Sequence, residues 1–308
     1  MYNHKLHHRQ LTAWLLGAII PTTIQLTAGG SWLSLLLVSI YSTLCVWFRW
    51  RFGTEPKGEV ICILWLMLYS LLLGTAAQAS IGSWPTGGHP VASAALLLLA
   101  AWSAWKGTEA AARVGSVLFW FVLLLYIVLL VTGIREVQWQ WLTPTKGDVN
   151  SLGCILLLTP AAAAIHLEGK RNFKPRLLIT VVLCTLSALI TAGVLSPTVA
   201  ARQKDAFYQM TGSLSILSHA QHFEAVLSAG MTVGWFLLFS LYLTGCATIF
   251  EKIKKGRGRW GILSATVIGQ IILLCQLHIP GVLLLVLCAI FWVFLPVLTQ
   301  WIDPEKKS

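Results

Sequence analysis

Residues 226–250 read VLSAGMTVGWFLLFSLYLTGCATIF and contain no charged side chain. The next nine residues, 251–259, read EKIKKGRGR, and five of them are Lys or Arg. A helix needs about 20 apolar residues to cross about 30 Å of hydrocarbon, and basic residues concentrate on the cytoplasmic side of a membrane. This pair of segments therefore predicts a transmembrane helix whose carboxyl end lies in the cytoplasm.

The same alternation of apolar runs and short polar gaps continues along the chain. Of its 308 residues, 56% are hydrophobic and 11% are charged, whereas about 25% are charged in an ordinary soluble domain. Ten apolar spans are recognisable, at residues 11–28, 31–48, 60–80, 90–105, 114–132, 152–164, 177–195, 226–250, 260–277 and 281–301. We therefore expect an all-α integral membrane protein with ten transmembrane helices.

The basic residues fall on alternate gaps between these spans. Eighteen of the 22 Lys and Arg residues share the side of the N-terminus, and four (Arg135, Lys146, Arg202 and Lys204) lie on the other. An even number of spans with both termini in the cytoplasm satisfies the positive-inside rule. The net charge of +11 is scattered over separate short loops, which favours contact with anionic membrane lipid and not with nucleic acid.

Ten spans divide into five plus five, and an odd number per half gives the halves opposite orientations. The chain, 1–308, is thus expected to form one transmembrane domain of two inverted repeats, about 11–132 and 152–301. Gly17 and Pro21 interrupt span one, and Gly153 and Thr159-Pro160 interrupt span six. Because proline removes a backbone donor inside hydrocarbon, we expect broken helices at spans one and six, with an ordinary proline kink as the alternative.

Broken helices at matching positions of inverted repeats bind solutes near the membrane midplane. Free backbone amides at such a break favour a carboxylate, as in an amino acid. The expected ligand-binding residues are Gly17, Pro21, Thr22, Thr23 and Gln25 of span one, Tyr69 of span three, and Thr159 and Pro160 of span six. The alternative for the polar members is that they only hydrogen-bond between helices.

Four ionisable residues are candidates for gating or for an ion pathway. Glu109 and Arg113 are four residues apart at the start of span five, so their charges can pair on one helix face. His222 and Glu224 lie near the outer end of span eight. The alternatives are a pair that only holds a helix end and a solvated end of a long helix. The sequence contains no HExxH, GxSxG or GxxxxGK[ST] signature, so we expect no enzymatic activity, cofactor or metal.

Residues 106–119, KGTEAAARVGSVLF, resemble the Gly-x-Glu-x-x-Ala-Arg segment that opens the fifth helix of the spore germination permease family. These proteins are the B subunits of three-part germinant receptors, in the amino acid, polyamine and organocation transporter superfamily. Residues 17–21, 28–33 and 222–226, and the basic loop after span eight, agree in kind. The resemblance, which covers nearly the whole chain, implies a LeuT-like five-plus-five fold. It also implies a bacterial cell membrane that becomes the spore inner membrane, with A-type and lipoprotein C-type subunits as partners.

The leading functional expectation is a germinant-sensing subunit. A small nutrient, commonly an amino acid, would bind near the midplane between spans one, three, six and eight and trigger ion release. One alternative is a secondary transporter of amino acids or amines, coupled to H⁺ or Na⁺. Another is a structural membrane subunit that holds its partners and binds nothing.

Overall fold

The computed structural model describes residues 8–26, 58–81, 90–142, 174–202, 210–211, 223–277, 279 and 281–295, and positions 33, 36–37, 40–41, 44–45 and 47–48. Helices make up the regular structure of these residues, and no strand occurs among them. Three helical segments are long and apolar enough to cross a membrane, namely Glu59–Ile81, Thr108–Arg135 and Val226–Ile253. The fold is therefore all-α, with the composition of a membrane protein.

Most of the predicted spans coincide with helices. These are α1 (His8–Leu26), α3 (Glu59–Ile81), α4 (Pro90–Trp105), α5 (Thr108–Arg135), α7 (Lys174–Leu195), α10 (Phe223–Ile253), α11 (Gly258–Leu274) and α12 (Gly281–Ala289). A π-helical turn, η2 (Ile290–Phe294), extends α12, and two short helices, η1 (Trp139–Trp141) and α8 (Pro197–Arg202), follow α5 and α7. Span six and most of span two lie outside the described residues, so the ten-helix count and the inverted repeat stay predictions.

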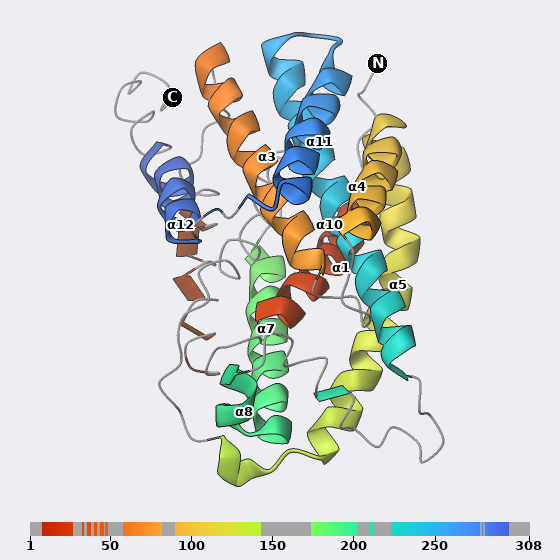
Figure 1. The fold of residues 1–308 in the computed structure, drawn as a ribbon, viewed down its shortest axis with the longest axis vertical. Coiled ribbons are helices and arrows are strands. Elements are labelled where there is room, and N and C mark those ends of the chain that lie inside the picture. The colour runs from red at the N-terminus through yellow and green to blue at the C-terminus, as the bar shows by residue number, and fades with distance from the viewer. Residues whose placement is uncertain are drawn as a thin grey trace.

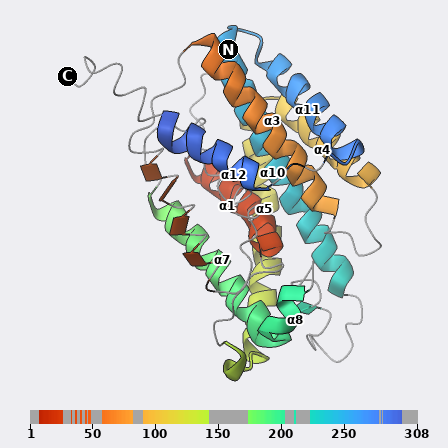
Figure 2. The same ribbon diagram turned by 60° about the vertical axis from the view of Figure 1, so that its left-hand side comes forward.

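The helix α10 forms the centre of the bundle (Figure 1). It contacts α1, α3, α4, α5 and α11. In an apolar 18-residue stretch of α10, 78% of the residues are buried, whereas 39% are buried in the corresponding stretch of α5. A helix that is apolar on all sides is stable only where other helices surround it, whereas α5 keeps a face available to lipid. The helix α7 contacts α1 and α5, and α8 lies against α7 (Figure 2).

Contacts between helix ends show which ends lie together. The Arg259 guanidinium at the start of α11 lies 5.4 Å from the ring centroid of Trp105 at the end of α4. Near the other end of α11, the Gln78 amide of α3 donates hydrogen bonds to the carbonyl oxygens of Ile272 (2.9 Å) and Leu277 (3.1 Å). Thus α11 runs parallel to α3 and antiparallel to α4. This agrees with a chain whose successive helices cross the membrane in alternating directions.

Candidate functional site

The expected break in span one is wrong, because α1 is a continuous helix from His8 to Leu26 with Pro21 inside it. Proline in a membrane helix is tolerated where neighbouring helices pack around the altered backbone. Here the Pro21 ring is seated against Gly234 of α10, where an added Cβ would lie 2.9 Å from Pro21 Cδ. Pro21 therefore lies within a continuous, packed helix, and the alternative of an ordinary proline kink stays a prediction.

Gly17 also serves close packing and not an unwound segment. A Cβ at this position would lie 2.6 Å from Leu237 Cδ1 of α10 and 3.6 Å from the Cα of Phe119 of α5. In lipid, where tails are as apolar as leucine, helices associate mainly through such close contacts at small residues. Gly17 thus lets α1 approach α10 and α5 together.

Little space adjoins Pro21, one of the described residues of the predicted ligand-binding wall. A cavity of about 10 Å³ adjoins Ile20 and Pro21, and Tyr126 and apolar residues of α5 and α10 complete its lining. A single water needs at least about 10–15 Å³. This cavity is therefore too small for an amino acid, and the Tyr126 hydroxyl already donates to the Leu183 carbonyl oxygen of α7.

The remaining expected wall residues are only partly described. Thr22, Thr23 and Gln25 continue α1 after Pro21, but their side chains lie outside the described part of the chain. Thr159 and Pro160 fall in residues 143–173, which are not described. The expected break in span six is therefore neither supported nor contradicted.

Trp14 attaches α1 to the central helix. Its indole N–H donates to the carbonyl oxygen of Leu237 (3.1 Å) and to Ser240 Oγ (3.2 Å), both on α10. On its other side the ring packs against Gly115 of α5. The side chain is fully buried, so an indole without these acceptors would be costly inside hydrocarbon. Trp14 therefore sets the position of α1 between α5 and α10.

Tyr69 lies deep between α3 and α10, opposite Tyr242. Both side chains are fully buried, and their ring centroids are 6.1 Å apart in an edge-to-face arrangement. Tyr69 is ten residues after Glu59, and Tyr242 is eleven residues before Ile253. At 1.5 Å per residue, each is about 15 Å from the same end of the bundle, half of the roughly 30 Å hydrocarbon thickness. The pair therefore lies at the depth expected of the membrane midplane.

The Tyr242 hydroxyl is buried and has no hydrogen-bond partner among the described residues. The indole N–H of Trp292 on η2 is likewise buried without a hydrogen-bond partner among the described residues. The preceding residue, Phe291, packs its ring against that of Trp65, with 5.4 Å between the ring centroids. An unsatisfied buried polar group costs about 1–3 kcal/mol, and such groups mark places for water, ions or ligands. We call Trp65, Tyr69, Tyr242, Phe291 and Trp292 the midplane aromatic cluster.

The predicted pair of Glu109 and Arg113 forms a salt bridge at the start of α5. Both side chains are exposed, the arginine by 67% and the glutamate by 45%. The preceding Gly107 has φ +113°, a conformation that side chains other than glycine rarely adopt, and it separates the last turn of α4 from α5. Glu109 and Arg113 therefore lie at a surface helix end and away from the midplane aromatic cluster.

The second predicted ionisable group is only partly described. Glu224 is in the first turn of α10, but its side chain lies outside the described residues, as does the whole of His222. Their proposed place in an ion pathway stays a prediction. Within the described part of the chain, no three His, Cys, Asp or Glu side chains lie close enough to hold a metal ion.

Sequence reasoning named Tyr69 but missed Tyr242 and Trp292. The signal for Tyr242 was the same as for Tyr69, a phenol in the interior of an apolar span. Its importance depends on its lack of a partner, which only the packing of α3, α10 and α12 reveals.

Neither the known protein families nor the curated proteins contain a match to this chain.

Proposed function

We propose that this chain is the permease-like membrane subunit of a spore germinant receptor and that it senses a small nutrient such as an amino acid. It would reside in the spore inner membrane, with both termini cytoplasmic, alongside A-type and lipoprotein C-type subunits. The observation that carries the proposal is the buried, unsatisfied Tyr242 hydroxyl facing Tyr69 at the depth of the membrane midplane. A polar ligand atom would satisfy this hydroxyl.

The packing of three helices expected to surround the ligand supports this proposal, because two of them meet the third. The central α10 touches both α1 and α3. Trp14 bonds to α10 within a few residues of Tyr242, at Leu237 and Ser240. Because Gly17 and Pro21 are tightly packed, this conformation is the closed one, and ligand entry requires α1 to move relative to α10. A nutrient shifts that equilibrium only through different affinities for the two states.

The test removes the hydroxyl and keeps the ring. Tyr242→Phe should raise the free energy of unfolding of the ligand-free protein by about 1–3 kcal/mol, because it deletes an unsatisfied buried group. It should also raise the nutrient concentration that half-saturates germination by about tenfold, the loss of one hydrogen bond of about 1.4 kcal/mol. Germination of receptor-deficient spores that express each variant, with a panel of L-amino acids, supplies the second measurement.

Tyr126→Phe is the matched control. The Tyr126 hydroxyl of α5 already donates to the Leu183 carbonyl oxygen (3.1 Å) and contacts Ser187 Oγ of α7. This variant should therefore lower stability and leave the nutrient response unchanged. Equal nutrient responses for wild type and both variants would contradict a ligand at Tyr242.

Flux distinguishes a sensor from a transporter. Purified protein in proteoliposomes should bind a labelled amino acid without accumulating it in the lumen. Accumulation driven by a gradient of H⁺ or Na⁺ would instead establish the secondary transporter.

The second candidate function is a structural subunit that binds no nutrient. The close packing of Gly17 against Leu237, and of Pro21 against Gly234, favours it, because protein fills the expected wall at these two described residues. Under this hypothesis Tyr242→Phe would stabilise the protein without any change in nutrient response, and the partner subunits would still co-purify with it.

A further inference from the structure

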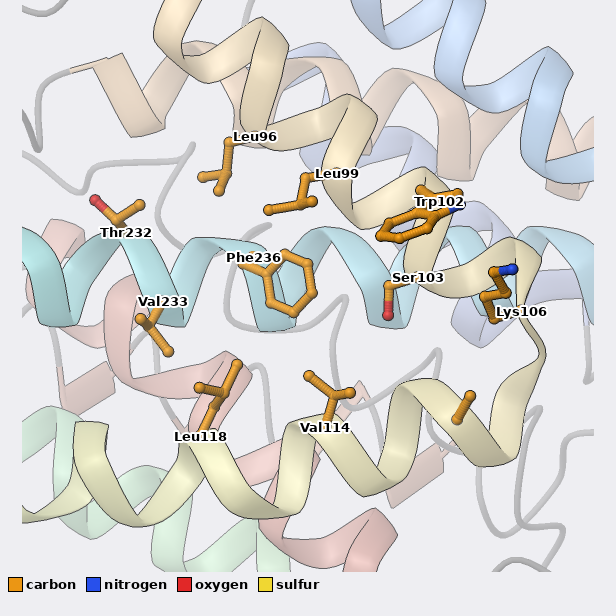
Figure 3. A pocket seen from close by; sticks show the side chains of 11 residues that line it. Leu96, Leu99, Trp102, Ser103, Lys106, Val114, Leu118, Thr232, Val233 and Phe236 are labelled. Carbon is orange, nitrogen blue, oxygen red and sulfur yellow. The ribbon is translucent and has the colours of Figure 1, made fainter.

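A groove opens on the outside of the bundle where α4, α5 and α10 meet (Figure 3). Its volume is about 440 Å³. Leu96 of α4 and Phe236 of α10, each 9% exposed, form its floor. Leu99 of α4 and Val114 of α5 are 51% and 42% exposed and form its rims. The groove thus faces the surroundings of the bundle and is distinct from the midplane aromatic cluster.

Polar character is confined to one end of this groove. At the end formed by Leu96 and Thr232, the Thr232 hydroxyl already donates a hydrogen bond to the Ser228 carbonyl oxygen (2.8 Å). The opposite end, called the near end below, contains Ser103 and Lys106, and the Lys106 ammonium lies 5.5 Å from the ring centroid of Trp102. Figure 3 shows Lys106 and Trp102 together at one end and Leu96 and Thr232 at the other. A suitable ligand is therefore apolar along its length and ionic at one tip.

The length of the groove matches one leaflet of a bilayer. Along α4 and the turn that follows it, Leu96 and Lys106 are ten positions apart. At 1.5 Å per residue this is about 15 Å, half of a hydrocarbon core of about 30 Å. Spread over that length, its volume gives a cross-section of roughly 30 Å². A helix about 10 Å across needs roughly 80 Å². The groove therefore cannot enclose a helix of a partner protein, and a single alkyl chain suits it.

The charge at the near end selects an anion. Besides Lys106, Arg259 lies over the neighbouring Trp105 at 5.4 Å from its ring centroid. The nearby carboxylate of Glu109 is engaged by Arg113. Among the residues that the structure describes, no carboxylate forms an ion pair with Lys106. Lys and Arg next to Trp are typical of the interface where phosphate headgroups lie.

We infer that this groove binds one anionic phospholipid of the surrounding membrane. One acyl chain lies on Leu96 and Phe236 between α4 and α5, and the phosphate contacts the Lys106 ammonium. The bound lipid then connects α4 and α10 to α5, at the end of the bundle where Gly107 separates α4 from α5.

Native mass spectrometry of the purified full chain, titrated with dioleoyl phosphatidylglycerol or dioleoyl phosphatidylcholine, tests the inference. The two lipids have identical chains and differ in net headgroup charge. Wild type should retain one phosphatidylglycerol in preference to phosphatidylcholine. Lys106→Ala should weaken phosphatidylglycerol binding about fivefold, the effect of one basic residue near an anionic surface. It should weaken phosphatidylcholine binding less, because the choline cation already compensates the charge of that phosphate. Val114→Trp, which fills the groove, should weaken both lipids.

Each variant has a matched control on the same part of the bundle. Lys254→Ala removes a positive charge from the loop after α10, outside the groove. Val117→Trp adds the same bulk to the 71% exposed face of α5, also outside the groove. Both controls should bind phosphatidylglycerol as wild type does. If Val114→Trp does not fold, Leu99→Trp on the opposite rim takes its place.

Several outcomes would overturn the inference. Equal retention of the two lipids by wild type would show that no headgroup is recognised. Equal losses for Lys106→Ala and Lys254→Ala would reduce the effect to general surface charge. Displacement of the lipid by inorganic phosphate alone would identify a free-anion site. Co-purification of a protein in place of the lipid would make the groove a protein interface.

Discussion

Gly115 of α5 provides the sharpest test of how α1 is held. A Cβ added there would lie 2.7 Å from both Cδ1 and Cγ of Trp14 and 3.0 Å from its Cβ. These atoms belong to a rigid ring close to the α1 backbone, and the ring is held from the other side by Leu237 and Ser240. Gly115→Ala must therefore displace α1 from α5 or pull the Trp14 indole from its acceptors.

The expected loss of stability follows from three contributions. Overpacking a well-filled contact costs about 1–3 kcal/mol. Weakening an interhelical hydrogen bond in a membrane protein costs about 0.6–1.7 kcal/mol. Replacing glycine by alanine inside a helix returns about 1 kcal/mol. Gly115→Ala should therefore lower the free energy of unfolding by about 2 kcal/mol.

Titration of the purified protein from mild detergent into SDS measures this change. A thiol-reactive dye labels the exposed Cys275 at the outset, and its further reaction reports exposure of the buried Cys246 and Cys288. Gly269→Ala in α11 is the control, because its Cβ would come no closer than 3.3 Å to Leu97 Cδ2, the flexible end of a side chain. It should remain within about 1 kcal/mol of wild type.

A double-mutant cycle with Trp14→Phe identifies the cause. Phenylalanine keeps Cγ and Cδ1 but lacks the indole N–H that holds the ring against Leu237 and Ser240. In the Trp14→Phe background the ring can therefore shift, so Gly115→Ala should cost at least about 1 kcal/mol less than in wild type. Strict additivity of the two substitutions would refute the reasoning. So would a Gly115→Ala protein as stable as Gly269→Ala.

Two further predictions concern a helix end and a surface ion pair. Gln78→Leu removes the donor to the carbonyl oxygens of Ile272 and Leu277, so hydrogen exchange should become faster at the carboxyl end of α11 and stay unchanged at its start. Arg113→Ala should change the free energy of unfolding by no more than about 1 kcal/mol, because its ion pair with Glu109 is exposed, and SDS titration measures it. A loss of several kcal/mol would instead show that this pair is essential to the fold.

The predicted spans match the observed helices closely in some cases and only in part in others. The predicted span 90–105 has the same bounds as α4, because Pro90 and the charged turn at Lys106 delimit the apolar run on both sides. The predicted span 114–132 is shorter than α5 (Thr108–Arg135), since the polar first turn with Glu109 and Arg113 is helical but is not apolar. Hydropathy marks the part of a helix that suits hydrocarbon, while the helix itself continues into the interface.

The site was less predictable than the helices. Pro21 was expected to unwind span one, yet the outcome depended on Gly234, a residue 213 positions away that accepts its ring. Tyr69 was identified from its polarity, but its neighbour Tyr242 was not. A side chain's solvation depends on what lies opposite it, and that partner comes from another part of the chain.

The sequence by itself determined that the chain is helical and apolar enough for a membrane, and it located most of the described helices. These properties are local, because the transfer of a helix into lipid depends on the residues of that segment alone. Only the tertiary structure decided which faces meet: Gly17 and Pro21 against α10, Tyr69 against Tyr242, and an open groove beside Lys106. Lipid tails are as apolar as leucine, so hydropathy does not distinguish a face that meets lipid from one that meets protein. Shape complementarity between distant residues makes that distinction.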